Sequence, residues 1–195
     1  MECARATYQD DDTIRLHVLD ASDLPFPDSS FDVVLLFECI YYLPDPQRAL
    51  EEAHRVLRPG GCLLIAPVNC EWRGFNPSPF SRQYPAADEL QMRLEQCGFA
   101  VEMRAGFPES RGILSLLVSS IRRIAVRLRL VPRTMNGKAF LKRIFYGGLQ
   151  PIPARMSLRP FTIDPLEPVT AATDLTRYRV LYAAARRGAE VSPEI

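Results

Sequence analysis

Two short apolar runs, separated by a helical pattern and a glycine turn, constrain the fold of this chain more than any other feature. The first is Phe31 to Phe37 (FDVVLLF) and the second is Cys62 to Ala66 (CLLIA). Both are nearly continuous in apolar residues, as central strands of a parallel sheet covered on both faces are. Between them, Asp45 and Pro46 mark a helix start, because Asp favours the cap and Pro the first turn. The order strand, helix, strand predicts an α/β fold with a parallel sheet.

The remaining elements extend this pattern in both directions. Further strands are predicted at Ile14 to Leu19, Phe99 to Met103 and Arg177 to Ala185, and a further helix at Asp88 to Cys97, with Gly98 beyond its end. At 195 residues the chain is most simply one domain. Residues 108–174 interrupt the alternation and are interpreted as a helical and loop insertion before the last strand.

The insertion is strongly basic, although the net charge of the whole chain is only +1. Residues 104–160 contain twelve Lys and Arg residues and a single acid, Glu109. Within them, residues 111–133 form an amphipathic pattern, with Leu and Ile on one face and Arg122 and Arg129 opposite. Three interpretations stay open: a lid that binds an anionic acceptor, a peripheral contact with an anionic membrane, or a solvated helix over the acceptor site. No nucleic-acid partner is expected, since no binding motif accompanies the charge.

The numbers and spacing of cysteine and histidine residues bear on two predictions, whether the chain has a metal site and in which cellular compartment it lies. The five cysteines include no CxxC pair, and the only histidines are His17 and His54, so no metal site is expected. Reduced, buried thiols favour a cytoplasmic protein, with peripheral membrane contact left open by the basic insertion. No uncharged apolar stretch approaches the ~18 residues needed for a membrane span.

A longer constellation of motifs carries a family resemblance. It comprises Asp20-Ala21, Leu24-Pro25-Phe26, Asp28, Ser30-Phe31-Asp32, Leu43-Pro44-Asp45-Pro46 and Arg55-Val56-Leu57-Arg58-Pro59-Gly60-Gly61. Together these motifs resemble the small-molecule, type 11-like branch of the class I S-adenosylmethionine-dependent methyltransferases. The resemblance implies a Rossmann-like sheet, S-adenosyl-L-methionine as cofactor, and methyl transfer to a small-molecule or lipid-linked acceptor.

The resemblance also implies which strands are present. In such enzymes seven strands lie in the order 3-2-1-4-5-7-6, the last one antiparallel. Ile14 to Leu19 would be strand 3 and Phe31 to Phe37 strand 4, so strands 3 to 7 are present. Strands 1 and 2, with the glycine-rich cofactor loop, have no counterpart. Residues 1–195 would then form a single partial methyltransferase domain.

Without strand 1, strand 4 becomes an apolar edge that is open to another chain, including a second copy. Three explanations for the missing strands 1 and 2 stay open. The start codon is misassigned and the protein is longer, the gene is a degraded fragment, or strand 3 pairs directly with strand 4.

The same resemblance implies cofactor contacts at Asp20, Ala21, Phe37 and Glu38. At a strand end, the Asp20 carboxylate would accept the adenine amino group, and the Ala21 backbone amide would read a ring nitrogen. The alternative is that Asp20 only forms the turn before Leu24. Glu38 could equally be an ordinary loop carboxylate.

Candidate acceptor residues follow the two central strands. Tyr41 and Tyr42 stand where relatives often carry histidines, and a phenol there could orient a nucleophile or line the pocket. A packed aromatic pair is the alternative. Four residues of the loop after the second apolar run either line the acceptor pocket or pack that loop: Trp72, Phe75, Asn76 and Phe80.

Two hypotheses for function follow. The first is S-adenosylmethionine-dependent methyl transfer. The second is a noncatalytic methyltransferase-like remnant, or a partner-dependent subunit that binds another chain through its exposed sheet edge. A dinucleotide-dependent oxidoreductase fits poorly, because the glycine-rich turn after a first strand is absent.

Overall fold

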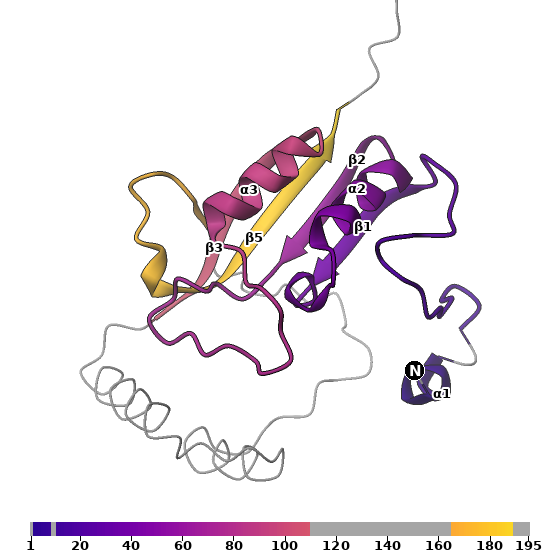
Figure 1. Cartoon of the computed structure of the whole chain (residues 1–195), viewed down its shortest axis with the longest axis horizontal. Coiled ribbons are helices and arrows are strands. Elements are labelled where there is room, and N and C mark those ends of the chain that lie inside the picture. The colour runs from indigo at the N-terminus through magenta and orange to yellow at the C-terminus, as the bar shows by residue number, and fades with distance from the viewer. Residues whose placement is uncertain (1, 9–10, 110–164, 189–195) are drawn as a thin grey trace, which may run out of the picture. The chain divides into compact units, whose positions relative to one another are not determined.

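The computed structural model describes residues 2–8, 11–109 and 165–188. The chain divides into two compact units, residues 1–106 with 166–195, and residues 107–165. The elements that form the hydrophobic core lie in the first unit (Figure 1). The predicted insertion at 108–174 and the amphipathic pattern at 111–133 lie largely outside the described residues, so both stay predictions.

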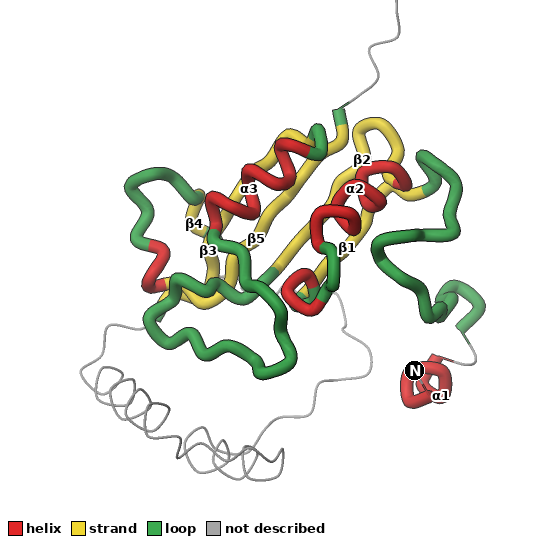
Figure 2. Tube along the Cα trace, viewed as in Figure 1, coloured by secondary structure: helices red, strands yellow, loops and turns green. Residues whose placement is uncertain are grey.

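The centre of the fold is a five-stranded sheet in the order β1-β2-β5-β3-β4 (Figures 1 and 2). Strand β1 is parallel to β2, and β5 is antiparallel to β2. This confirms the predicted α/β fold and the antiparallel last strand. The strands are β1 (Phe31–Phe37), β2 (Leu57–Ala66), β3 (Phe99–Pro108), β4 (Glu167–Pro168) and β5 (Tyr178–Arg187).

Two helices form where the sequence predicts them. Helix α2 (Pro46–Val56) begins after Asp45, whose carboxylate accepts the Arg48 N–H at 3.0 Å. Helix α3 (Ala87–Gln96) ends at a turn in which Gly98 has a φ of +88°, a conformation that glycine adopts without strain. A short helix, α1 (Glu2–Tyr8), precedes them, and the 3-10 turns η1 (Ile40–Tyr42) and η2 (Leu175–Arg177) complete the set.

The core lies between the sheet and helices α2 and α3, which cover the same face (Figure 1). Along a strand the side chains on this face alternate with those on the other, and in the middle of β5 every second residue is buried. The fully buried side chains include Leu50, Leu63, Ile65, Leu90, Leu94 and Leu181. Their burial is the main source of stability in this part of the chain.

The opposite face of β1 differs from expectation. Val33, Leu35 and Phe37 are each more than half exposed. The prediction that this strand is covered on both faces is therefore wrong for the described residues. An apolar run does not by itself say how many layers cover it, because coverage depends on elements elsewhere in the chain.

The strand predicted at Ile14 to Leu19 does not form, and these residues have no regular secondary structure. In the described part of the chain, β1 pairs with β2 alone and forms the edge of the sheet, as predicted. A strand needs a neighbour to satisfy its backbone groups, and no described strand pairs with residues 14–19. Direct pairing of this segment with β1 is therefore also wrong.

Other boundaries shift by a few residues. Strand β2 begins at Leu57 and includes the glycine turn, with a register shift opposite Phe31 and Val33. Strand β3 runs on to Pro108, beyond the predicted end at Met103. Among the described residues, no helix is long and apolar enough to cross a bilayer. Cytoplasmic location and peripheral membrane contact stay predictions.

Candidate active site

The segment that leads into β1 is fixed on helix α2 by an ion pair. Arg55 donates to the carbonyl oxygens of Leu24 and Phe26 and to the Asp28 carboxylate, at 2.7–2.9 Å. It also donates to Glu52, which accepts the Leu24 N–H at 2.9 Å. These hydrogen bonds, from Arg55 first and Leu24 second, lower the pKa of the buried Glu52 to about 2. The Leu-Pro-Phe motif is thus held in place by two residues of the next helix.

Asp20 lies upstream of this fixed segment, in an exposed turn. Its carboxylate accepts the Ser22 N–H at 2.9 Å, and the Asp23 N–H donates to its carbonyl at 3.2 Å. Asp20 therefore forms the turn before Leu24 that the sequence analysis gives as the alternative to cofactor binding. A carboxylate can accept further hydrogen bonds, so the turn leaves capacity for a ligand. The roles of Asp20 and the half-buried Ala21 in cofactor binding stay predictions.

Glu38 stands at the carboxyl end of β1 in an unusual backbone conformation. Its φ is +53°, which costs a residue with a side chain about 1 kcal/mol or more. Its N–H donates to the Ala66 carbonyl at the end of β2, at 3.0 Å. The side chain is exposed. The two parallel strands therefore hold a strained residue with an exposed carboxylate at their common carboxyl edge.

Tyr41 holds this carboxylate. Its hydroxyl donates to Glu38 Oε2 at 2.5 Å, while the side chain is only 5% exposed. Burial first, and the bond to Glu38 second, raise the pKa of Tyr41 far above its ordinary value. The phenol of Tyr41 therefore remains protonated near neutral pH. It can orient Glu38, but it cannot act as a base.

An aromatic cluster surrounds Tyr41. Tyr84 stacks on the ring of Tyr41, with the two ring centroids 4.4 Å apart. The centroid of the Tyr42 ring lies 4.7 Å from that of Tyr41. Phe75 meets Tyr84 edge to face at 4.8 Å, and the Arg82 N–H donates to the Tyr41 carbonyl. Tyr41 and Tyr42 thus form an aromatic pair, which the sequence analysis gives as the alternative to a role in the acceptor site. Tyr42 is nevertheless 44% exposed, so its ring is accessible.

The four predicted loop residues separate in the structure. Phe75 is brought to the aromatic cluster. Trp72 instead packs beside Gly74 and beneath Arg179, whose guanidinium lies 5.4 Å from the ring centroid. Asn76 is exposed and Phe80 is 84% exposed. Whether any of them contacts an acceptor stays a prediction.

Tyr84 was missed by the sequence analysis. It lies in a proline-rich loop with no periodic pattern, more than forty residues from Tyr41, so no local signal marked it. Its hydroxyl also accepts the Ser78 N–H at 3.1 Å. These contacts fold the loop after β2 back over the turn after β1.

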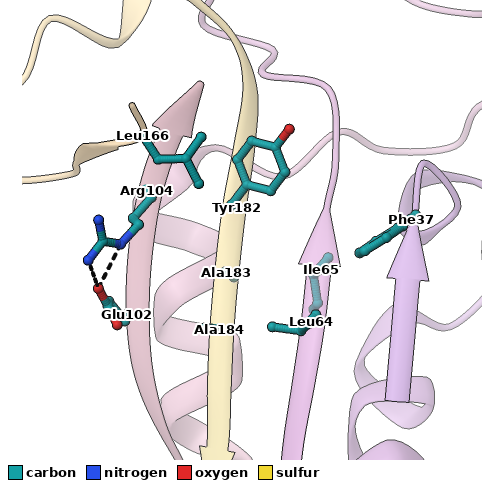
Figure 3. A pocket seen from close by; sticks show the side chains of 9 residues that line it. All are labelled: Phe37, Leu64, Ile65, Glu102, Arg104, Leu166, Tyr182, Ala183 and Ala184. Carbon is teal, nitrogen blue, oxygen red and sulfur yellow. Dashed lines mark hydrogen bonds and ion pairs between the residues drawn. The ribbon is translucent and has the colours of Figure 1, made fainter. Parts of the chain in front are cut away.

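An apolar hollow of about 180 Å³ lies on the sheet face opposite α2 and α3 (Figure 3). Its lining comes from β1, β2, β5 and β3 and includes Phe37, Leu64 and Tyr182, with the Glu102 and Arg104 ion pair among the lining residues. Burial first, and the negative charge of Glu38 second, raise the pKa of Tyr182.

Three of the described cysteines are poorly suited to act as nucleophiles. Cys39, Cys62, Cys70 and Cys97 are free and half-buried. Burial raises the pKa of three of these thiols, Cys39, Cys70 and Cys97, which suppresses the reactive thiolate. In the described residues no group of His, Cys, Asp or Glu side chains is arranged to hold a metal ion.

Known proteins are similar to this chain in sequence and in fold. A family model described as "Methyltransferase domain" matches residues 1–65. A probable S-adenosylmethionine-dependent methyltransferase of Mycolicibacterium smegmatis is 37% identical over 99 residues, covering 49% of this chain and 38% of that protein. Residues 1–65 therefore match the methyltransferase domain, and the chain is similar to the class of S-adenosylmethionine-dependent methyltransferases. Members of this class take their methyl group from S-adenosyl-L-methionine.

Two further relatives are also methyltransferases. A demethylmenaquinone methyltransferase of Tropheryma whipplei is 37% identical over 110 residues, covering 42% of this chain and 45% of that protein. A 2-methyl-6-phytyl-1,4-hydroquinone methyltransferase of Oryza sativa is 53% identical over 51 residues, covering 26% and 15%. The chain thus spans less than half the length of each of these three relatives.

A solved structure supports the fold. The YcgJ protein of Bacillus subtilis superposes with a TM-score of 0.55 at 15% identity, covering 96% of this chain and 77% of that protein. At this identity the likeness concerns the arrangement of the elements. It confirms the Rossmann-like methyltransferase fold.

Proposed function

We propose that this protein transfers a methyl group from S-adenosyl-L-methionine to a small or lipid-linked acceptor that carries an aromatic ring, such as a hydroquinone. The observation that carries the proposal is the pairing of Glu38 and Tyr41 at the carboxyl end of β1, beside the exposed ring of Tyr42. In open α/β sheets, ligands bind at the carboxyl ends of the strands. The names of two relatives, a hydroquinone and a demethylmenaquinone methyltransferase, support the acceptor class.

The residues at this edge fit the cofactor in charge and polarity. S-adenosyl-L-methionine supplies an electrophilic methyl group on a positively charged sulfur. Glu38 offers an exposed carboxylate that Tyr41 orients, and Phe37 offers a half-exposed ring beside it. Asp20 and Ala21 would hold the adenine end. A negative charge is favourable next to a cationic ligand, and more so where water is excluded.

Positioning is the main task left to the protein. Tyr41 keeps its proton and so fixes the Glu38 carboxylate instead of competing for protons. The accessible ring of Tyr42 offers a surface on which an aromatic acceptor can stack, a contact worth about 1 kcal/mol. Its hydroxyl can hydrogen-bond an acceptor oxygen. Alignment of acceptor and methyl group would supply much of the acceleration.

Methyl transfer to defined acceptors tests this proposal. The chain is incubated with S-adenosyl-L-methionine carrying an isotope-labelled methyl group and with a panel of hydroquinones and aliphatic alcohols. We expect label in hydroquinone products, and a rate about tenfold lower in Tyr42→Ala, where a stacking surface is lost. Tyr8→Ala is the matched control, because Tyr8 is a tyrosine of similar exposure in helix α1 and is not a candidate for the acceptor pocket. Label on the aliphatic alcohols alone would contradict the proposed acceptor class.

A noncatalytic, partner-dependent role is the second candidate, and one observation favours it. Within the described part of the chain, strand β1 has one edge without a partner strand and three half-exposed apolar side chains on one face. Such a surface is typical of a protein that binds another chain. Absence of any labelled product, together with absence of cofactor binding, would favour this candidate over methyl transfer.

A further inference from the structure

The loop between β2 and α3 is anchored at its start to the segment that enters β5 (Figure 2). Asn69 is fully buried in this loop, and its side-chain amide donates to the carbonyl oxygens of Leu175 and Tyr178, both at 2.8 Å. The Arg73 N–H donates to a carbonyl of η2 at 2.9 Å. The first half of the loop is therefore held in place by a distant part of the chain.

The second half of the loop makes two separate contacts with Tyr41. The Arg82 N–H donates to the main-chain carbonyl of Tyr41 at 2.9 Å. Two residues further on, the Tyr84 ring stacks on the Tyr41 ring, with the ring planes 29° apart. The first contact fixes the main chain of Tyr41, and the second fixes its ring. The loop after β2 therefore constrains a residue that belongs to the turn after β1.

Tyr84 is itself held by other parts of the loop. Its hydroxyl accepts the Ser78 N–H at 3.1 Å, and the Phe75 ring meets its ring at 4.8 Å with the planes 80° apart. The Ser81 hydroxyl donates to the Ser78 carbonyl at 2.6 Å, which tightens the same turn. Tyr84 is also half-buried against the hydrophobic core. Its ring is therefore a fixed surface against which the Tyr41 ring lies.

Tyr41 passes this constraint on to Glu38. Its hydroxyl donates to Glu38 Oε2, and among the described residues no other side chain donates to this carboxylate. A tyrosine hydroxyl lies at the far end of its ring, so a rotation of the ring about χ1 carries it out of hydrogen-bond range. The orientation of the Glu38 carboxylate therefore depends on what packs against the Tyr41 ring.

We propose that Tyr84 is a positioning residue of the candidate active site, which holds the Glu38 carboxylate in place by stacking on Tyr41. Tyr84 acts through Tyr41 and does not need to touch a ligand. The consequence for the cofactor rests on the proposed function, in which Glu38 attracts the positively charged S-adenosyl-L-methionine. A carboxylate that is already ordered loses less freedom when the ligand binds, so the stack should strengthen binding.

NMR of the Glu38 carboxyl carbon tests the positioning role without any cofactor. The protein is made with isotope-labelled glutamate, and the Glu38 signal is assigned by its loss in Glu38→Gln. We expect Tyr84→Leu and Tyr41→Phe to move this signal in the same direction, because both release the same hydrogen bond. Tyr84→Phe keeps the stack and should leave the signal in place. The matched control is Tyr178→Leu, since Tyr178 is also a half-buried tyrosine packed against the core.

Two results of this measurement would overturn the proposal. One is a Glu38 signal that stays in place in Tyr84→Leu, and the other is an equal movement in Tyr178→Leu. If circular dichroism shows that Tyr84→Leu is unfolded, Phe75→Leu takes its place, because the Phe75 ring packs on Tyr84. A smaller movement in the same direction is then expected, and an unmoved signal would again overturn the proposal.

Titration with S-adenosyl-L-methionine tests whether Tyr84 acts through Tyr41. Tyr84→Leu should raise the dissociation constant about threefold, as expected for the loss of one aromatic contact. Added to Tyr41→Phe, the same change should have no further effect, because the hydroxyl that it positions is already absent. Additive effects of the two changes would overturn the proposal. Absence of binding by every form, wild type included, would contradict the proposed function, whereas the Glu38 signal decides the positioning role independently.

Discussion

The two faces of the sheet carry side chains of similar apolarity but very different burial. On the face covered by α2 and α3, Leu63, Ile65 and Leu181 are fully buried. On the other face, Leu35 and Phe37 are more than half exposed. The difference shows that stability in this chain comes from one layer of helices packed on one face. Among the described residues, the other face of the sheet leaves apolar side chains exposed, and such a surface is suited to binding.

The largest expected contrast is between two leucines. Leu63→Ala removes a fully buried side chain next to the helices and should lower the free energy of unfolding by about 3 kcal/mol. Leu35→Ala, on the exposed face, should lower it by only about 0.5 kcal/mol or less. Urea unfolding of both variants, at a concentration where the chain is monomeric, measures the difference. Equal losses would mean that the two faces are equally covered.

The ion pair that fixes the segment before β1 should matter next. Glu52→Gln keeps the size of the side chain but removes the charge that Arg55 and Leu24 bind, and should cost about 2 kcal/mol. The exposed neighbour Glu51→Gln is the control and should cost about 0.5 kcal/mol or less. A loss as small as that of the control would show that the segment is held by its apolar contacts instead.

The same carboxylate predicts a pH dependence. The pKa of Glu52 is about 2 in the folded chain, against an ordinary value of 4.5. Between these values the unfolded chain binds more protons, so the contribution of Glu52 is complete above pH 4.5 and is lost as the pH falls toward 2. Unfolding measured from pH 6 down to pH 2 should show a smaller slope in Glu52→Gln than in the wild type. Identical slopes would contradict this assignment.

A smaller effect is expected at the start of helix α2. Asp45→Ala removes the acceptor for the Arg48 N–H and should cost about 1 kcal/mol. Asp12→Ala, at an exposed turn, is the matched control. Thermal unfolding of the two variants should separate them by a few degrees. If both variants melt like the wild type, the cap is not needed to fix the helix.

The sequence predicted the elements whose signals are local. The bounds of β1, the Asp45 cap and the Gly98 turn follow from residue types at fixed spacings, and all three are confirmed. The strand predicted at Ile14 to Leu19 is wrong, because a local pattern cannot supply the neighbour that a strand requires. For the same reason, the apolar run of β1 did not reveal that only one of its faces is covered.

The candidate site divides in the same way. Glu38 and the tyrosine pair after β1 could be selected from the sequence, because the motifs place them at a strand end. The bond between Tyr41 and Glu38 and the stacking of Tyr84 could not. Both depend on a left-handed backbone at Glu38 and on a loop that returns from beyond β2. Neither feature has a signature in the sequence.

Calorimetric titration of the chain with S-adenosyl-L-methionine tests the proposed function most directly. We predict saturable binding, weakened about tenfold in Glu38→Gln, where a charge-assisted contact is lost. Tyr41→Phe should weaken binding less, because it only releases the carboxylate. Glu51→Gln, at an exposed position on α2, should bind like the wild type. No binding by the wild-type chain, or equal affinity in Glu38→Gln, would contradict a cofactor site at the carboxyl end of β1.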